Sequence, residues 1–268
     1  MSKIYAHRGF SSMEPENSIE AIIEATKYDY IDGIEIDIRM TKDEEFVLIH
    51  NKNIDLVSNG VGNVCDYTLE ELKKLDFHIN TLDYRTKYLK SFINKDGHTI
   101  RKKLRRNRKQ TFKIVTLEEV LEVIQNKILL IEIKYIVGDK FNFEKFLKII
   151  SKYKNKKILI QSFSKTIIKK LKGLNKNLDL GILIDNTQVQ EKLAMKTNFI
   201  SIRDKSIDNN ILVNELYKKK EVNVWTVNYY RDLKKLVSKV DGKINSLNII
   251  TDEPDLIYKY LNLLNKKK

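Results

Sequence analysis

Short apolar segments alternate with amphipathic segments along most of this 268-residue chain. A half-buried strand repeats its apolar positions every second residue and an amphipathic helix every three or four, so the pattern separates the two. The predicted strands are 4–7, 33–38, 46–50, 128–134, 158–162, 180–184, 199–202, 222–226 and 248–251. The predicted helices are 18–27, 69–75, 117–125, 143–153, 165–171, 187–195, 209–219, 230–239 and 255–264.

The spacing of these segments restricts the topology. Too few residues separate 33–38 from 46–50 for a crossover helix, so the second segment is predicted to return antiparallel as a hairpin. The eight other strands alternate with helices, which predicts an α/β fold of the (β/α)8 TIM-barrel type, with 1–268 as a single domain. A doubly wound open sheet is the alternative, but no glycine-rich dinucleotide loop follows any of the strands.

Residues 51–113 interrupt this alternation and are predicted to form a basic, loop-rich insertion after the second strand and its hairpin, without a core element. The run Arg101–Lys109 contains seven basic residues and no acid, half of the formal net charge of +14. Such a run can contact anionic lipid or nucleic acid, and a solvated loop is the simpler interpretation. Without an aromatic RNA-binding signature or zinc-finger spacing, we expect no specific nucleic-acid partner and at most weak contact with an anionic membrane.

Composition bears on the cellular setting. Cys65 is the single cysteine, which excludes an internal disulfide and fits a reducing compartment. No apolar run approaches membrane-spanning length. Strand-like residues begin at Lys3, which leaves no room for a signal peptide. We therefore expect a cytoplasmic protein.

The segment 33–39 reads Gly-Ile-Glu-Ile-Asp-Ile-Arg, in which isoleucines alternate with charged residues. A strand of this kind places Glu35 and Asp37 on one face, about 7 Å apart. The segment 131–134 repeats the pattern and supplies Glu132. Three such carboxylates suit one hard divalent cation, Mg²⁺ or Ca²⁺. A surface strand with solvated charges is the alternative.

In a barrel, the carboxyl ends of the strands form the rim that carries the active site. The residues predicted at these ends are His7, Arg8, Glu35, Asp37, Glu132, Lys134, Ser162, Trp225, Thr226 and Asn228. A hairpin turn centred on Asp43-Glu44 would place His50 opposite Asp37. His78 and His98 lie in the insertion and are expected to be ordinary surface histidines.

Motifs along the whole chain carry a family resemblance. They are His7-Arg8-Gly9, Pro15-Glu16-Asn17-Ser18, Gly33–Asp37, Thr41-Lys42-Asp43, His50, Gly60-Val61-Gly62, Thr116–Leu121, Glu132-Ile133-Lys134, Gln161-Ser162-Phe163, Trp225-Thr226-Val227-Asn228 and Ile249–Asp255. In this order and spacing the chain resembles the glycerophosphodiester phosphodiesterases, metal-dependent barrel enzymes related to bacterial phosphatidylinositol-specific phospholipases C. One departure is Asn51, where the family usually has aspartate after the second histidine.

The resemblance implies a role for each rim residue. Glu35, Asp37 and Glu132 would bind the metal, His7 and His50 would be the general acid and base, and Arg8 and Lys134 would hold the phosphate. Trp225 would form a wall of the substrate pocket or belong to the core. Glu16 and Asn17 would either support the site from behind its contacting residues or, with Asn17 as N-cap, only begin the first helix.

The implied reaction is the metal-dependent hydrolysis of small glycerophosphodiesters to glycerol 3-phosphate and an alcohol. One alternative is a lysophospholipase D-type activity on lysophospholipids, which a broad apolar patch beside the site would favour. The other is a non-catalytic barrel whose insertion binds anionic membrane or nucleic acid.

Overall fold

The structure, a computed structural model, describes residues 2–78, 89–93, 99–103, 111–135, 138–207, 221–240 and 247–265. Eight parallel strands form a closed barrel, because β1 pairs with both β2 and β11. In barrel order the strands are β1 (Ile4–His7), β2 (Gly33–Met40), β6 (Ile128–Ile133), β7 (Ile158–Ser162), β8 (Asp179–Ile184), β9 (Phe199–Arg203), β10 (Glu221–Trp225) and β11 (Leu247–Thr251). The predicted TIM barrel is confirmed.

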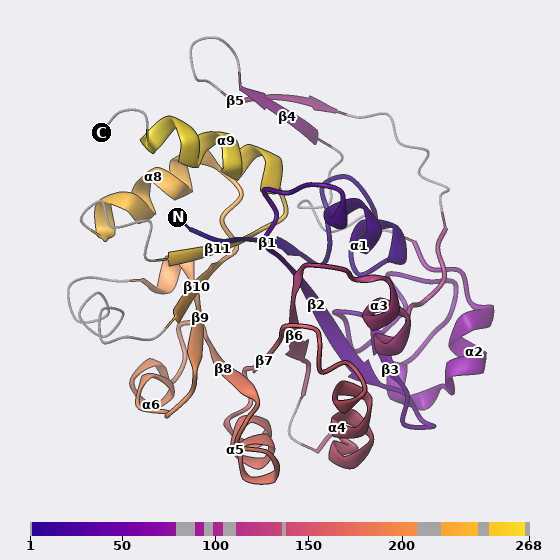
Figure 1. Cartoon of the computed structure of the whole chain (residues 1–268). Helices are drawn as coiled ribbons and strands as arrows, with labels where there is room; N and C mark the ends of the chain where they lie inside the picture. The colour runs from indigo at the N-terminus through magenta and orange to yellow at the C-terminus, as the bar shows by residue number, and fades with distance from the viewer. Residues whose placement is uncertain are drawn as a thin grey trace.

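Helices surround this ring of strands (Figure 1). They are α1 (Ile19–Thr26), α3 (Leu117–Val123), α4 (Phe143–Ser151), α5 (Lys165–Leu174), α6 (Val189–Leu193), α8 (Tyr230–Lys239) and α9 (Pro254–Asn265), with a 3₁₀ turn at Asp204–Ser206. Side chains of Ser18, Thr116, Asn142 and Ser164 cap four of the helices by accepting a backbone N–H of the first turn. The predicted helix 209–219 lies outside the described residues.

Two apolar clusters belong to the barrel. The larger lies between the strands and the helices and includes the isoleucines of β2. The smaller fills the barrel interior and consists of Tyr5, Leu130, Leu159, Phe199 and Ile250, with Ile128 and Trp225 packed against it. Because the interior is filled with side chains, polar groups that react with a ligand must lie at the carboxyl ends of the strands.

Strand β3 (Phe46–Leu48) forms the predicted antiparallel hairpin with β2, but in another register. Ile38 lies opposite Leu48, and Ile49 N donates to Asp37 O at 3.1 Å, so Asp37 faces Ile49 and not His50. Thr41 N donates to Glu45 O at 2.9 Å, and Glu44 has a φ of 63°. The turn is therefore centred on Asp43, because a left-handed residue closes a three-residue loop.

The expectation that the insertion contributes no core element is wrong for its first part. Residues 51–78 contain a 3₁₀ turn (Val64–Asp66) and α2 (Leu69–Lys74). They form an apolar cluster with the outer side of the hairpin, consisting of Val47, Ile49, Ile54, Val64, Leu72, Phe77 and Ile114. The sequence pattern missed it because its members come from turns and short elements without a regular period.

The second part of the insertion contains an antiparallel pair, β4 (Leu89–Ile93) and β5 (Thr99–Lys103). The first three residues of the basic run, 101–103, thus belong to β5. Residues 104–110 and His98 lie outside the described residues. In the described part of the chain, no helix has the length and apolar character needed to cross a bilayer.

Candidate active site

Three carboxylates meet at the rim of the barrel. Asp37 of β2 lies beside Glu132 of β6 in the parallel register, and Glu35 precedes Asp37 by two residues on the same face. Each offers an oxygen within 4.8 Å of the others. Their exposed fractions are 1% for Glu35, 1% for Asp37 and 6% for Glu132. Three buried carboxylates at this spacing repel each other unless cations neutralise them.

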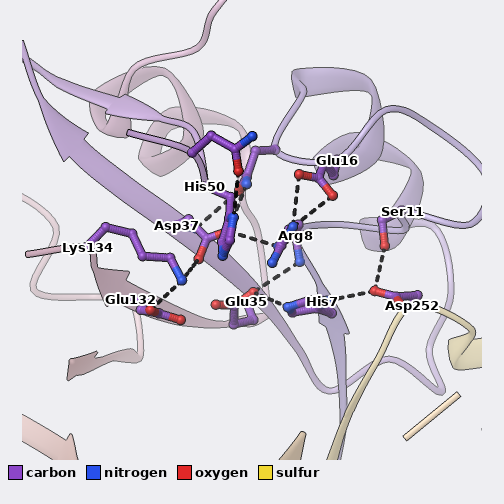
Figure 2. A network of polar contacts seen from close by, with 12 residues as sticks. His7, Arg8, Ser11, Glu16, Glu35, Asp37, His50, Glu132, Lys134 and Asp252 are labelled. Atoms are coloured by element: carbon purple, nitrogen blue, oxygen red, sulfur yellow. Dashed lines mark hydrogen bonds and ion pairs between the residues drawn. The ribbon is translucent and has the colours of Figure 1, made fainter. Parts of the chain in front are cut away.

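Two cationic side chains contact this cluster (Figure 2). Lys134 Nζ lies 3.0 Å from Asp37 Oδ1 and 2.5 Å from Glu132 Oε1. Arg8 Nε lies 3.0 Å from Asp37 Oδ2, and Arg8 Nη1 lies 2.9 Å from both carboxylate oxygens of Glu16. Burial by itself raises the pKa of Asp37, but Lys134 and Arg8 outweigh it and hold that pKa well below its usual range. Burial and repulsion from Asp37 raise the pKa of Glu35 to about 8.

His7 lies between two carboxylates on one side of the cluster (Figure 2). Its Nδ1 is 2.6 Å from Asp252 Oδ1, and its Nε2 is 3.9 Å from Glu35 Oε2. Asn228 orients Asp252 by donating to Oδ2 and by accepting the Asp252 N–H at 2.8 Å. Burial and Arg8 lower the pKa of His7, yet Asp252 and Glu35 outweigh them, so the net shift is upward. The imidazolium form of His7 is therefore favoured.

His50 lies on the side of Asp37, beyond the end of β3 (Figure 2). Its Nδ1 is 2.9 Å from Asn51 Oδ1, and its backbone oxygen accepts from Arg39 Nε at 3.0 Å and from Arg39 Nη2 at 2.9 Å. Burial lowers the pKa of His50 to about 4, despite the opposing charge of Asp37. His50 is therefore neutral at physiological pH. Because Asn51 Oδ1 can only accept, the ring hydrogen lies on Nδ1 and Nε2 keeps its lone pair.

Local backbone geometry brings these groups together. Arg8 has a φ of 56° and Gly9 a φ of 80°, so the chain turns sharply after β1. A Cβ on Gly9 would lie 2.7 Å from Ala21 of α1, so the turn requires glycine there. The predicted N-cap Asn17 is wrong, because Ser18 Oγ accepts the Ala21 N–H instead. Asn17 Nδ2 donates to Asp37 Oδ2 at 3.0 Å, and Asn17 Oδ1 accepts the Asp37 N–H at 3.1 Å.

Two other residues of the predicted rim lie away from the carboxylates. Trp225 is half-buried at the end of β10 and packs edge-on against Phe163, with ring centroids 5.7 Å apart. Its Nε1 has no hydrogen-bond partner among the described residues. Ser162 donates to Ile133 O at 2.8 Å and accepts from Ser164 N, which is a structural role.

An apolar slot runs beside His50, between the barrel rim and the insertion. Its walls include Val57, Phe77, Phe112 and Ile114, and its volume is about 30 Å³. His78, expected to be an ordinary surface histidine, is half-buried and lines this slot.

Two contributors to the site, Asp252 and Arg39, were not among the predicted site residues. Asp252 directly follows the predicted strand 248–251, so the rule for strand ends could have found it. Arg39 acts through a contact with the His50 backbone that no local pattern reveals.

Comparison with known proteins agrees with this architecture. The model of the "Glycerophosphoryl diester phosphodiesterase family" matches residues 7–256. A glycerophosphodiester phosphodiesterase of Caldanaerobacter subterraneus subsp. tengcongensis is 31% identical over 271 residues, covering 98% of each chain. One of Bacillus altitudinis is 29% identical and covers 97% of this chain and 98% of its own.

Solved structures share the fold. The chain is similar to a phosphodiesterase of Oleispira antarctica in complex with the product sn-glycerol-3-phosphate, with a TM-score of 0.74, 21% identity and coverage of 98% and 97%. It is also similar to a glycerophosphodiester phosphodiesterase of Thermotoga maritima, with a TM-score of 0.66, 23% identity and coverage of 97% and 98%. The family match over nearly the whole chain, together with these similarities, shows that the chain belongs to the glycerophosphoryl diester phosphodiesterase family, a family of phosphodiester-cleaving enzymes.

Proposed function

We propose that the chain hydrolyses glycerophosphodiesters to glycerol 3-phosphate and an alcohol with the help of one divalent cation. The observation that carries this proposal is the cluster of Glu35, Asp37 and Glu132, whose buried oxygens lie within 4.8 Å of one another between two histidines. The family and the product-bound Oleispira antarctica relative support the same reaction class.

The three carboxylates fit a hard divalent cation. Asp37 Oδ1 and Glu132 Oε1 are buried, and the cation at contact distance from both oxygens is Lys134. Oxygen donors of this kind suit Mg²⁺ or Ca²⁺. When bound, the cation would polarise a phosphoryl oxygen and neutralise its charge in the transition state.

The remaining groups supply the rest of the chemistry. Arg8, which is buried, and Lys134, which is half-buried, lie at the edge of the cluster, where they can bind the anionic phosphate and stabilise further negative charge. His50 Nε2, which is unprotonated above about pH 4, takes a proton from the attacking hydroxyl. His7, held as imidazolium by Asp252, donates a proton to the leaving alkoxide. Water supplies the elements added across the broken P–O bond.

Glycerol 3-phosphate release tests this proposal. Excess EDTA should abolish turnover of glycerophosphocholine, and added Mg²⁺ or Ca²⁺ should restore it. Glu132→Gln should weaken metal binding measured by calorimetry while keeping the fold, because it removes one of three charged ligands. Glu122→Gln, on the exposed face of α3, is the control and should behave as wild type. Full activity in excess EDTA would contradict the metal assignment.

The apolar slot gives little support to a lysophospholipase D-type activity. Its volume of about 30 Å³ has room for roughly two water molecules and not for an acyl chain. Release of choline from lysophosphatidylcholine should therefore be slow compared with release from glycerophosphocholine.

A further inference from the structure

A larger cavity opens next to the catalytic cluster, between the β2–β3 hairpin and the loop that joins β6 to α4. Its volume is about 400 Å³. Five cationic side chains line it: Arg39, Lys42, Lys52, Lys134 and Lys140. Only two carboxylates, Glu44 and Asp139, face them. The cavity therefore carries an excess of three positive charges and shares Lys134 with the catalytic site.

The strand register explains why two of these cationic residues lie beside the carboxylates, one on each of two neighbouring strands. On β2, Arg39 comes two residues after Asp37, and on the neighbouring β6, Lys134 comes two residues after Glu132. Lys134 N donates to Ile38 O at 3.1 Å, which continues the pairing to this level. Two residues of strand advance by about 7 Å. The backbone positions of Arg39 and Lys134 thus lie one step outside those of Asp37 and Glu132, and Lys134 Nζ reaches back to contact both carboxylates.

The two carboxylates of the cavity already have partners. Asp139 Oδ1 accepts from Lys52 Nζ at 2.8 Å, and Glu44 Oε2 accepts from Asn142 Nδ2 at 2.6 Å. In contrast, no carboxylate of the described residues lies within 4.0 Å of a side-chain nitrogen of Arg39, Lys42 or Lys140. Among the described residues, Arg39 donates to the backbone oxygen of His50 and is half-buried. Its guanidinium has no direct ion-pair partner there, although the more distant Asp37, Asp139 and Glu132 act on its charge.

We propose that this basic cavity binds a second phosphate group, carried by the alcohol half of the substrate. The inference rests on the proposed function and makes the substrate a glycerophosphodiester whose alcohol is itself a phosphorylated polyol. Lys134 would contact the reacting phosphate, which leaves an excess of two positive charges in the cavity and matches a phosphate dianion.

Paired kinetics test the inference. We would compare kcat/KM for glycerophosphocholine, which has no second anionic group, with kcat/KM for glycerophosphoglycerol phosphate, in wild type and in Lys42→Gln/Lys140→Gln. Both lysines are exposed, and neither forms an ion pair or contacts a catalytic group among the described residues. Wild type should prefer the doubly phosphorylated substrate. The double variant should lose this preference by roughly threefold to tenfold, as expected for two exposed charges, and keep its rate on glycerophosphocholine.

The matched control is Lys234→Gln/Lys235→Gln, which removes the same charge from the exposed face of α8, on another side of the barrel (Figure 1). It should keep the wild-type preference, and an equal loss would overturn the inference by showing a general charge effect. Equal kcat/KM for the two substrates in wild type would also overturn it. If millimolar inorganic phosphate inhibits wild type but not the lysine double variant, and no substrate preference exists, the cavity binds free phosphate and the substrate assignment is wrong. Failure of wild type to release glycerol 3-phosphate from either substrate would instead overturn the proposed function.

Discussion

His7 and His50 flank the same carboxylates but have opposite surroundings. The Nδ1 atom of His7 faces the carboxylate of Asp252, whereas that of His50 faces the amide of Asn51. The first partner raises the pKa of His7 against the effect of burial, and without such a partner burial lowers the pKa of His50 to about 4. When two imidazoles are both buried, one neighbouring charge can therefore decide which of them is suited to donate a proton and which to accept one.

The largest effect is expected when the imidazole ring of either histidine is removed. His7→Ala and His50→Ala should each reduce kcat by roughly 10²-fold or more, because each removes a general acid or base. Glycerol 3-phosphate release at saturating substrate measures this. His78→Ala, which lines the apolar slot, is the control and should remain within about twofold of wild type. A His50→Ala enzyme with the wild-type rate would show that another group accepts the proton.

A smaller effect is expected when Asp252, the partner of His7, is changed to the kind of amide that faces His50. Asp252→Asn removes the charge that raises the pKa of His7, so that pKa falls and the alkaline limb of the pH profile moves to lower pH. An opposite charge at this distance shifts a pKa by about one to three units, which predicts a loss of about tenfold or more at pH 8 and a smaller loss at pH 6. Asp255→Asn, in the first turn of α9, should leave the profile unchanged. A loss that is equal at every pH would mean that Asp252 only positions the ring.

The reverse exchange, a carboxylate in place of the amide beside His50, should move the acid limb of the pH profile. Asn51→Asp places a carboxylate beside His50, so its pKa rises from about 4 and the acid limb moves upward. Activity should fall severalfold near pH 5 and stay close to wild type at pH 8, which a pH series of kcat/KM would reveal. Asn53→Asp, two residues further along the same exposed loop, is the control. An unchanged acid limb would contradict the role of His50 as the base.

The smallest effect is expected from the basic run. Replacing the basic residues of 101–109 by Gln should change kcat on glycerophosphocholine by less than about twofold, because charges of a solvated loop beyond about 8 Å from the substrate would be screened at physiological salt. Binding to vesicles that contain an anionic lipid should fall in the same variant without a change in kcat, and a sedimentation assay would detect it. A large fall in kcat would place one of these residues in the catalytic site.

The extent to which the sequence predicts this molecule depends on the kind of contact. Alternation of Ile34, Ile36 and Ile38 predicts β2 and the shared face of Glu35 and Asp37, because strand geometry has a fixed period. The hairpin register was not predicted. The left-handed Glu44 moves the centre of the turn by half a residue, so each residue of β2 faces a residue one position earlier in β3 than predicted. The pairing of His7 with Asp252 was not predicted either, because the two residues lie 245 positions apart and no local rule joins them.

That separation also has a consequence for how the chain is made. Synthesis proceeds from the amino end, so His7 and the three carboxylates leave the ribosome long before β11 and Asp252. Until β11 is available, β1 has an unpaired edge and the barrel remains open. A chain interrupted before residue 247 would hold the proposed metal ligands, yet it would lack both the closing strand and the charge that raises the pKa of His7. Closure of the barrel and completion of the proposed acid catalyst are thus one event, and we expect a half-made chain to have no phosphodiesterase activity.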